Sequence, residues 1–200
     1  MDAAKLQLKI FTAPGSDIPS EEFIPVLHTF IKHQKLPELL IDVANYTHVP
    51  RGPGVVLIGH GTDYFIDESV GRQGLLFNRK RQAPPPAERL QDTFARALHA
   101  AVVLEGEPAL AGKLKFATDE LMFRINDRLM APNNDGTMES VRGELEAFCT
   151  RLFGAAGFSL TRVGHARELF AVSIKINQPA PLATLLERVG GAPKAAQAAA

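Results

Sequence analysis

Histidines, glycines and carboxylates crowd one stretch of the chain, residues 46 to 67. His48 and Arg51 stand in the segment YTHVPRGPG, His60 lies between two glycines, and Asp63 and Asp67 follow it. If this segment folds over the end of the next strand, two imidazoles and two carboxylates converge. Such groups bind divalent metals or small ligands, and a histidine beside an aspartate serves as a general base. These five residues are the predicted binding site.

Two functions remain open for this site. In the favoured one, the chain is a non-catalytic binding or assembly module without a cofactor or metal, and its partner is a second copy of itself, another protein or a small ligand. In the alternative, the chain is a small metal-assisted hydrolase in which His48, His60 and Asp63 hold a divalent metal. The structural alternative is that His60 is a turn residue and that the aspartates face water.

Motifs for other chemistry are missing, which favours the non-catalytic function. The segment GEPALAGK has five residues between its glycines, where a phosphate-binding loop has four, and Leu114 stands where that loop needs a hydroxyl. The sequence contains no G-x-S-x-G motif, and Cys149 lies on an apolar stripe, which predicts a core thiol.

Composition excludes several classes of protein. The 200 residues are 46% apolar, enough for a substantial core, and 22 basic residues balance 22 acidic ones. A formal charge of zero argues against a nucleic-acid partner. We expect a soluble, cytoplasmic protein without a membrane partner, because no apolar run approaches the roughly 18 residues of a membrane span. A single cysteine rules out an intramolecular disulfide.

Apolar periodicity predicts the elements that position the site. The segment GVVLIGHGTDYFID predicts the central strand of a sheet and its neighbour. Leu6, Leu8 and Ile10 alternate with Gln7 and Lys9, which predicts a strand with one solvated side. Further strands are expected near 39–44, 74–79, 158–163 and 169–176, with a hairpin or a bulged strand over 114–125. Helices are expected near 23–31, 87–104, 137–152 (capped by Thr137) and 181–189.

These elements predict an α+β fold with a mostly antiparallel sheet, eight or nine strands and about four helices, because the short turns leave no room for parallel crossovers. A basic run and three prolines near residues 79–86 suggest an N-terminal half (1–82) and a C-terminal half (87–190), or one continuous domain, before a disordered tail (191–200).

A shift of 118 positions superposes Ala13-Pro14-x-x-Asp17 on Ala131-Pro132-x-x-Asp135. The match predicts an internal duplication of a strand-helix-strand-strand unit, over 5–60 and 120–176. A cleft between two such copies would be a natural ligand site.

Overall fold

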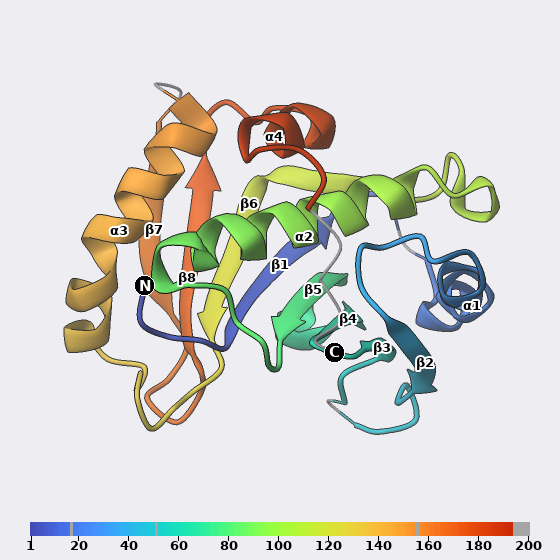
Figure 1. Ribbon diagram of the computed structural model, residues 1–200, viewed down its shortest axis with the longest axis horizontal. Coiled ribbons are helices and arrows are strands. Elements are labelled where there is room, and N and C mark those ends of the chain that lie inside the picture. Colours follow the sequence, from blue (N-terminus) through green and yellow to red (C-terminus); the bar gives the residue numbers. More distant parts are fainter. Residues whose placement is uncertain (17, 51, 155–156, 194–200) are drawn as a thin grey trace.

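The structure is a computed structural model, which describes residues 1–16, 18–50, 52–154 and 157–193 (Figure 1). Its strands are β1 (Leu6–Thr12), β2 (Leu40–Asn45), β3 (Val55–Gly59), β4 (Thr62–Asp67), β5 (Gly74–Arg79), β6 (Phe116–Ile125), β7 (Phe158–Val163) and β8 (Phe170–Ile176). Its α-helices are α1 (Phe23–His33), α2 (Arg89–Glu105), α3 (Asp135–Phe153) and α4 (Leu182–Arg188). Within the described residues, the strands form one antiparallel sheet in the order β2-β3-β4-β5-β1-β6-β8-β7. The predicted α+β class, antiparallel sheet and four helices are confirmed.

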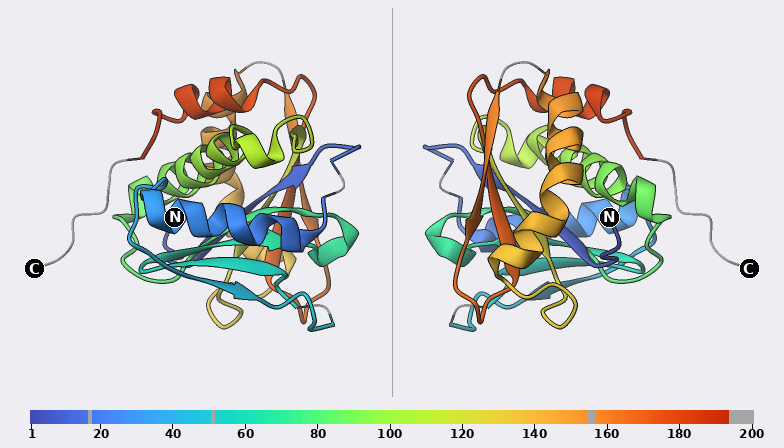
Figure 2. Two further views of the ribbon diagram at one scale, coloured as in Figure 1. Left: turned by 90° about the vertical axis from the view of Figure 1, so that its right-hand side faces the viewer. Right: turned by 90° about the vertical axis from the view of Figure 1, so that its left-hand side faces the viewer.

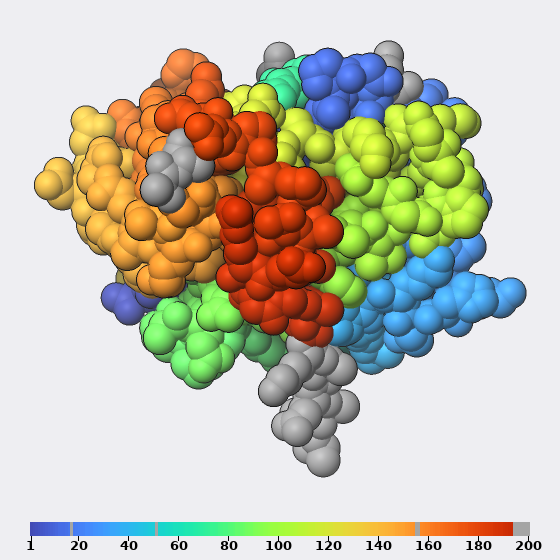
Figure 3. Space-filling view, turned by 90° about the horizontal axis from the view of Figure 1, so that it is seen from above, coloured from blue at the N-terminus to red at the C-terminus, as the bar shows by residue number. Residues whose placement is uncertain are grey.

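The helices cover one face of this sheet. Helix α2 crosses the middle of the sheet against β1 and β5, α1 packs beside β2, and α3 packs beside β7 (Figure 1). Helix α4 lies between α2 and α3, as the view from above shows (Figure 3). Alternate strand residues point into this layer, and Leu8, Phe77, Phe123 and Val172 are completely buried there. Their period of two explains why the strands were predictable from the sequence.

Two local predictions needed correction. Helix α3 is capped by Asn134, whose side chain accepts a hydrogen bond from the backbone nitrogen of Thr137 at 2.9 Å, so Thr137 is not the cap. The expected central strand, β3, lies second from the edge of the sheet, and the middle positions belong to β5 and β1. An apolar run shows that a strand is covered, but it does not show how many strands lie on either side.

The second face of β1 is also not solvated. Gln7 and Lys9 point away from the helices, yet they are 6% and 0% exposed. The sheet is strongly twisted, so that β3 and β4 run across the direction of β7 and β8 (Figure 2). A bulge between Ile10 and Thr12, where β1 pairs with β6, adds to this curvature. The curled sheet therefore buries polar side chains on the face that has no helices, which we call the open face.

The two halves of the chain share this sheet, because β1 pairs directly with β6. Each half contains a strand, a helix and two strands in the predicted order, but β8 pairs with β6, whereas β4 and β5 separate β3 from β1. The duplication is therefore not confirmed. Asp17 and the tail from 194 to 200 lie outside the described residues. Among the described helices, none has the length and apolar character needed to cross a membrane.

Candidate functional site

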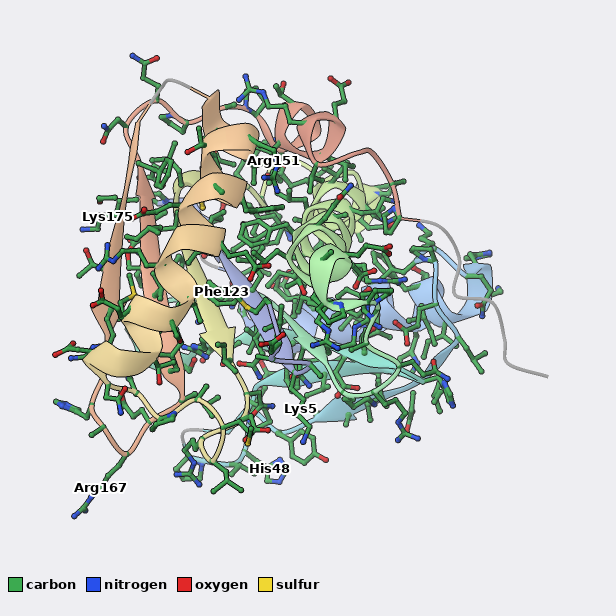
Figure 4. All side chains as sticks on the ribbon, turned by 60° about the vertical axis from the view of Figure 1, so that its left-hand side comes forward. Lys5, His48, Phe123, Arg151, Arg167 and Lys175 are labelled. Atoms are coloured by element: carbon green, nitrogen blue, oxygen red, sulfur yellow. The ribbon has the colours of Figure 1, made fainter. Side chains whose placement is uncertain are left out.

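The structure does not bring the two predicted histidines together. His48 lies in the loop before β3, and His60 lies in the turn after it, so the whole of this five-residue strand, roughly 16 Å long, lies between them. Both residues are exposed, and Figure 4 shows His48 at the lower end of the molecule. Arg51 lies outside the described residues.

The two predicted carboxylates lie at opposite ends of β4, and each contacts a lysine. Asp63 is 2.7 Å from the Lys80 ammonium, and Asp67 is 2.6 Å from the Lys9 ammonium. In the part of the chain that the structure describes, no three histidine, cysteine, aspartate or glutamate side chains form a group that could hold a metal ion. The described residues of the 46–67 segment therefore do not assemble into one site.

The turn around His60 is built for a different side chain, Glu38. Its carboxylate accepts hydrogen bonds from the backbone nitrogens of Gly61 at 2.5 Å and Thr62 at 2.9 Å, and from the Thr62 hydroxyl. A Cβ atom at Gly59 would lie 3.1 Å from the Glu38 side chain and 2.8 Å from the Thr62 carbonyl oxygen. The glycines therefore admit a buried carboxylate, which supports a structural role for this turn.

A groove of about 1490 Å³ runs over the open face, which we call the open-face groove. Its walls come from segments far apart in the sequence: the β2–β3 loop, the β4–β5 turn, β6, and the hairpin of β7 and β8. One wall carries Tyr46, Val49 and Val70, and the other carries the hydroxyls of Ser159, Thr161 and Ser173. Lys175 on β8 and Arg167 in the β7–β8 turn are also among the lining residues. Figure 4 shows the Arg167 side chain projecting from the end of the β7–β8 hairpin.

Arg124 of β6 lines this groove beside Met122 and is mostly buried. Its guanidinium donates to the Met122 sulfur at 3.2 Å and, at the longer distance of 3.4 Å, to the Ser69 hydroxyl. No described carboxylate lies within ion-pair distance. Burial lowers the pKa of Arg124, although attraction to Asp67 and Glu168 opposes the shift. Arg124 is therefore a desolvated cation that lacks a strong acceptor among the described residues.

The acidic side chains that line the groove already have partners. Glu120 contacts the Arg72 guanidinium at 2.6 Å and accepts from the Ser173 hydroxyl at 2.8 Å. Glu168 accepts from the backbone nitrogen of His165 at 2.9 Å. None of them forms an ion pair with Arg124, whose charge is offset, among the described residues, only by the longer-range attraction of Asp67 and Glu168.

Lys9 and Asp67 support the turn that forms one wall of the groove. The Lys9 ammonium donates to the carbonyl oxygens of Ser69 at 2.8 Å and Arg72 at 2.7 Å, and Asp67 accepts from the Ser69 hydroxyl at 2.6 Å. Burial lowers the pKa of Lys9 to about 8, against the attraction of Asp67. Between these anchors, Val70 adopts a left-handed φ of 62°, which is rare for a β-branched residue. Two of the predicted site residues that the structure describes therefore border the groove without lining it: Asp67 beside Ser69, and His48 between Thr47 and Val49.

Sequence reasoning missed Arg124, although one signal marked it. Leu121, Phe123 and Ile125 alternate toward the core, so Met122 and Arg124 had to face the other way. Nothing local distinguishes such an arginine from a solvated one, because the curvature of the sheet decides its burial. Comparison with protein-family models found no family that matches the chain, and a comparison with curated proteins found no relative.

Proposed function

We propose that this chain is a non-catalytic binding module that holds a small organic anion in the open-face groove. The observation that carries the proposal is Arg124. A guanidinium removed from water is costly unless an anion or strong acceptors satisfy it. A carboxylate or phosphate in the groove would supply that partner and could accept two parallel hydrogen bonds from the planar guanidinium.

The surroundings of Arg124 support binding more than catalysis. Ser159, Thr161 and Ser173 offer hydroxyls for hydrogen bonds to a ligand, and no histidine is among the described residues that line the groove. The Ser173 hydroxyl donates to Glu120, an arrangement that lacks the histidine base of common serine nucleophiles. No observation favours the metal-assisted hydrolase over binding.

Self-association stays a prediction, and one surface supports it. Two large apolar side chains are exposed at the edge strand β2: Leu39, directly before the strand, and Ile41, within it. The pairing of β2 with β3 is bulged between Leu40 and Asp42, which opposes edge-to-edge extension of the sheet. A second copy would therefore pack against these side chains. A monomeric mass by light scattering at micromolar concentration would contradict this prediction.

Ligand-induced stabilisation tests the binding proposal. Benzoate, AMP and decanoate are each added separately at millimolar concentration. We expect at least one of these anions to raise the melting temperature of the wild type, because a ligand that binds the folded state stabilises it. Arg124→Gln should remove this shift. Arg142→Gln is the matched control, since Arg142 lies on the exposed side of α3, 3.3 Å from Glu146.

The outcome is decisive for the groove. If none of the three anions changes the melting temperature, or if the shift survives in Arg124→Gln, the proposed binding function is wrong. Loss of the shift in both arginine variants would show a general charge effect, and would also count against the groove.

A further inference from the structure

We infer that the ligand of the open-face groove is an amphiphilic monocarboxylate, with its head on Arg124 and an apolar body of about ten carbons along the wall that carries Val70. This inference rests on the proposed binding function and specifies its ligand. It follows from three features of the groove: the apolar side chains that gather at its rim, the difference between its two sides, and its charge.

Exposed apolar side chains gather at the rim. Seven large apolar side chains are exposed among the described residues, and five of them lie on three loops near the groove: Tyr46, Val49, Val70, Leu129 and Met130. The first three line the groove, and the other two directly follow Arg128, which also lines it. Val70, Leu129 and Met130 are 60%, 90% and 78% exposed. Apolar groups gathered beside a groove indicate a ligand with an apolar part.

The turn that carries Val70 is held in place at some conformational expense. Val70 has a left-handed backbone, and buried Lys9 fixes the turn through the carbonyl oxygens of Ser69 and Arg72 on either side. A strained residue persists only where its surroundings hold it, and such residues concentrate at ligand sites. The strain places an apolar side chain at the groove where asparagine or glycine would suit the backbone better.

The two sides of the groove differ in the large exposed side chains and in the hydroxyls that they present. Tyr46, Val49 and Val70 stand on the loop side beside Glu68 and Ser69, and the hydroxyls of the β7–β8 side stand among smaller apolar residues such as Val163 and Ala171. Across from the Val70 turn, the pairing of β7 with β8 places Thr161 beside Ser173 and Ser159 beside Lys175. Arg124 lies on β6, which stands between β5 and the β8–β7 pair in the strand order. A carboxylate on Arg124 can therefore reach the hydroxyls, while the attached carbon chain follows the loop side.

The charge of the groove suits an anion. The described residues that line it include four basic side chains (Arg124, Arg128, Arg167 and Lys175) and three acidic ones (Glu68, Glu120 and Glu168), and Glu120 is already paired with Arg72 from outside the lining, so positive charge is in excess. A carboxylate meets this excess of positive charge, and its single charge is repelled less by Glu68 and Glu168 than the two charges of a nucleotide phosphate would be. The groove volume of about 1490 Å³ exceeds the roughly 300–1,000 Å³ of common small-ligand pockets, so an extended chain fits.

Isothermal titration with four probes tests the inference: decanoate, butyrate, decan-1-ol and AMP. Decanoate should bind on the order of 50-fold tighter than butyrate, because each fully buried methylene contributes about fourfold and an open groove buries about half of the chain. It should bind at least about 10-fold tighter than decan-1-ol, because only the acid has a charged head. AMP should bind more weakly than decanoate.

Two variants separate the head from the chain. Arg124→Gln should bring decanoate to the affinity of decan-1-ol and leave decan-1-ol unchanged. Val70→Asn should weaken decanoate about fivefold and leave butyrate unchanged. Asparagine tolerates the left-handed backbone, so this variant removes the apolar group without adding strain. Arg142→Gln should change none of these affinities.

Failure of the inference and failure of the binding function give different results. If AMP or butyrate binds as tightly as decanoate, and if this binding is lost in Arg124→Gln, the inference of an amphiphilic ligand is wrong and the proposed binding function stands. If the protein binds phosphatidylglycerol vesicles but not monomeric decanoate, the inference of an amphiphilic monocarboxylate is also wrong, and the groove binds a membrane surface instead. If no probe binds, both proposals fail.

Discussion

Replacement of Lys9 by methionine should destabilise the protein by about 3–4 kcal/mol. The Lys9 side chain is completely buried, its ammonium lies 2.6 Å from the Asp67 carboxylate, and it donates to two carbonyl oxygens. Methionine keeps most of the apolar stem but leaves the buried carboxylate without its cation. Removal of one partner from a buried ion pair costs about 3–5 kcal/mol.

The lower part of that range applies, because Asp67 keeps other donors. The Ser69 hydroxyl at 2.6 Å and the Ser69 backbone nitrogen at 3.2 Å still donate to it. For a chain of 200 residues, each kcal/mol lowers the melting temperature by about 2–4 °C, so a decrease of about 6–16 °C is expected.

Urea unfolding followed by far-ultraviolet circular dichroism measures this change, since the chain has no tryptophan for fluorescence. Lys5→Met is the matched control, because Lys5 is exposed just before β1 (Figure 4), and it should change the unfolding free energy by less than about 0.5 kcal/mol. The double variant Lys9→Met/Asp67→Leu should recover at least half of the loss, because it removes the orphaned charge.

Two results would refute this reasoning. A loss below about 1 kcal/mol for Lys9→Met would mean that the ion pair contributes no more than an exposed one. Additive losses in the double variant would show that Lys9 and Asp67 do not interact energetically.

Three further predictions concern the turns and the core. Glu38→Gln should lower the free energy of unfolding in urea by about 1.5–3 kcal/mol, because it removes the negative charge that the donors of the turn stabilise. His60→Ala in the same turn should change this free energy by less than about 0.5 kcal/mol. Equal losses in the two variants would contradict the structural role assigned to Glu38. Val70→Asn should raise the melting temperature by an amount equivalent to about 0.5–1 kcal/mol, because it relieves the left-handed strain, and a lowered melting temperature would oppose this. Burial raises the pKa of Cys149 to about 12, so above pH 9 the thiol loses its proton in the unfolded chain but keeps it in the folded one. The free energy of unfolding should therefore fall by up to about 1.4 kcal/mol for each pH unit above 9. An equal slope in Cys149→Ala would assign the fall to other groups.

The fold class was predictable because its signals are local. Periods of 2 and 3.6 residues mark the buried faces of strands and helices wherever these elements pack, so β1, α1 and β8 were recognisable from their own residues. Strand order depends on pairings between distant segments. The apolar run of β3 therefore could not show that β5 and β1 occupy the middle of the sheet.

The site was harder to predict than the fold, because the residue types that suggested chemistry have structural partners. Asp63 contacts Lys80, Asp67 contacts Lys9, and the glycines beside His60 make room for Glu38. A cluster in sequence becomes a cluster in space only if the chain turns back there. Here β3 keeps His48 and His60 apart.

The same physical reason explains why the groove escaped detection. Alternation along a strand identifies the face that packs on helices, but it leaves the other face undefined: that face can be solvated, or it can be the concave side of a curled sheet. Gln7 and Lys9 had the pattern of a solvated face, yet they are buried, and Arg124 pairs directly with Gln7 across β1 and β6. At Gly74, an added Cβ would lie 2.5 Å from the Ile10 carbonyl oxygen, so β5 approaches β1 more closely than a larger residue would allow. Basic residues on the polar side of central strands are therefore ligand-site candidates wherever glycines and bulges indicate that the sheet curls over them.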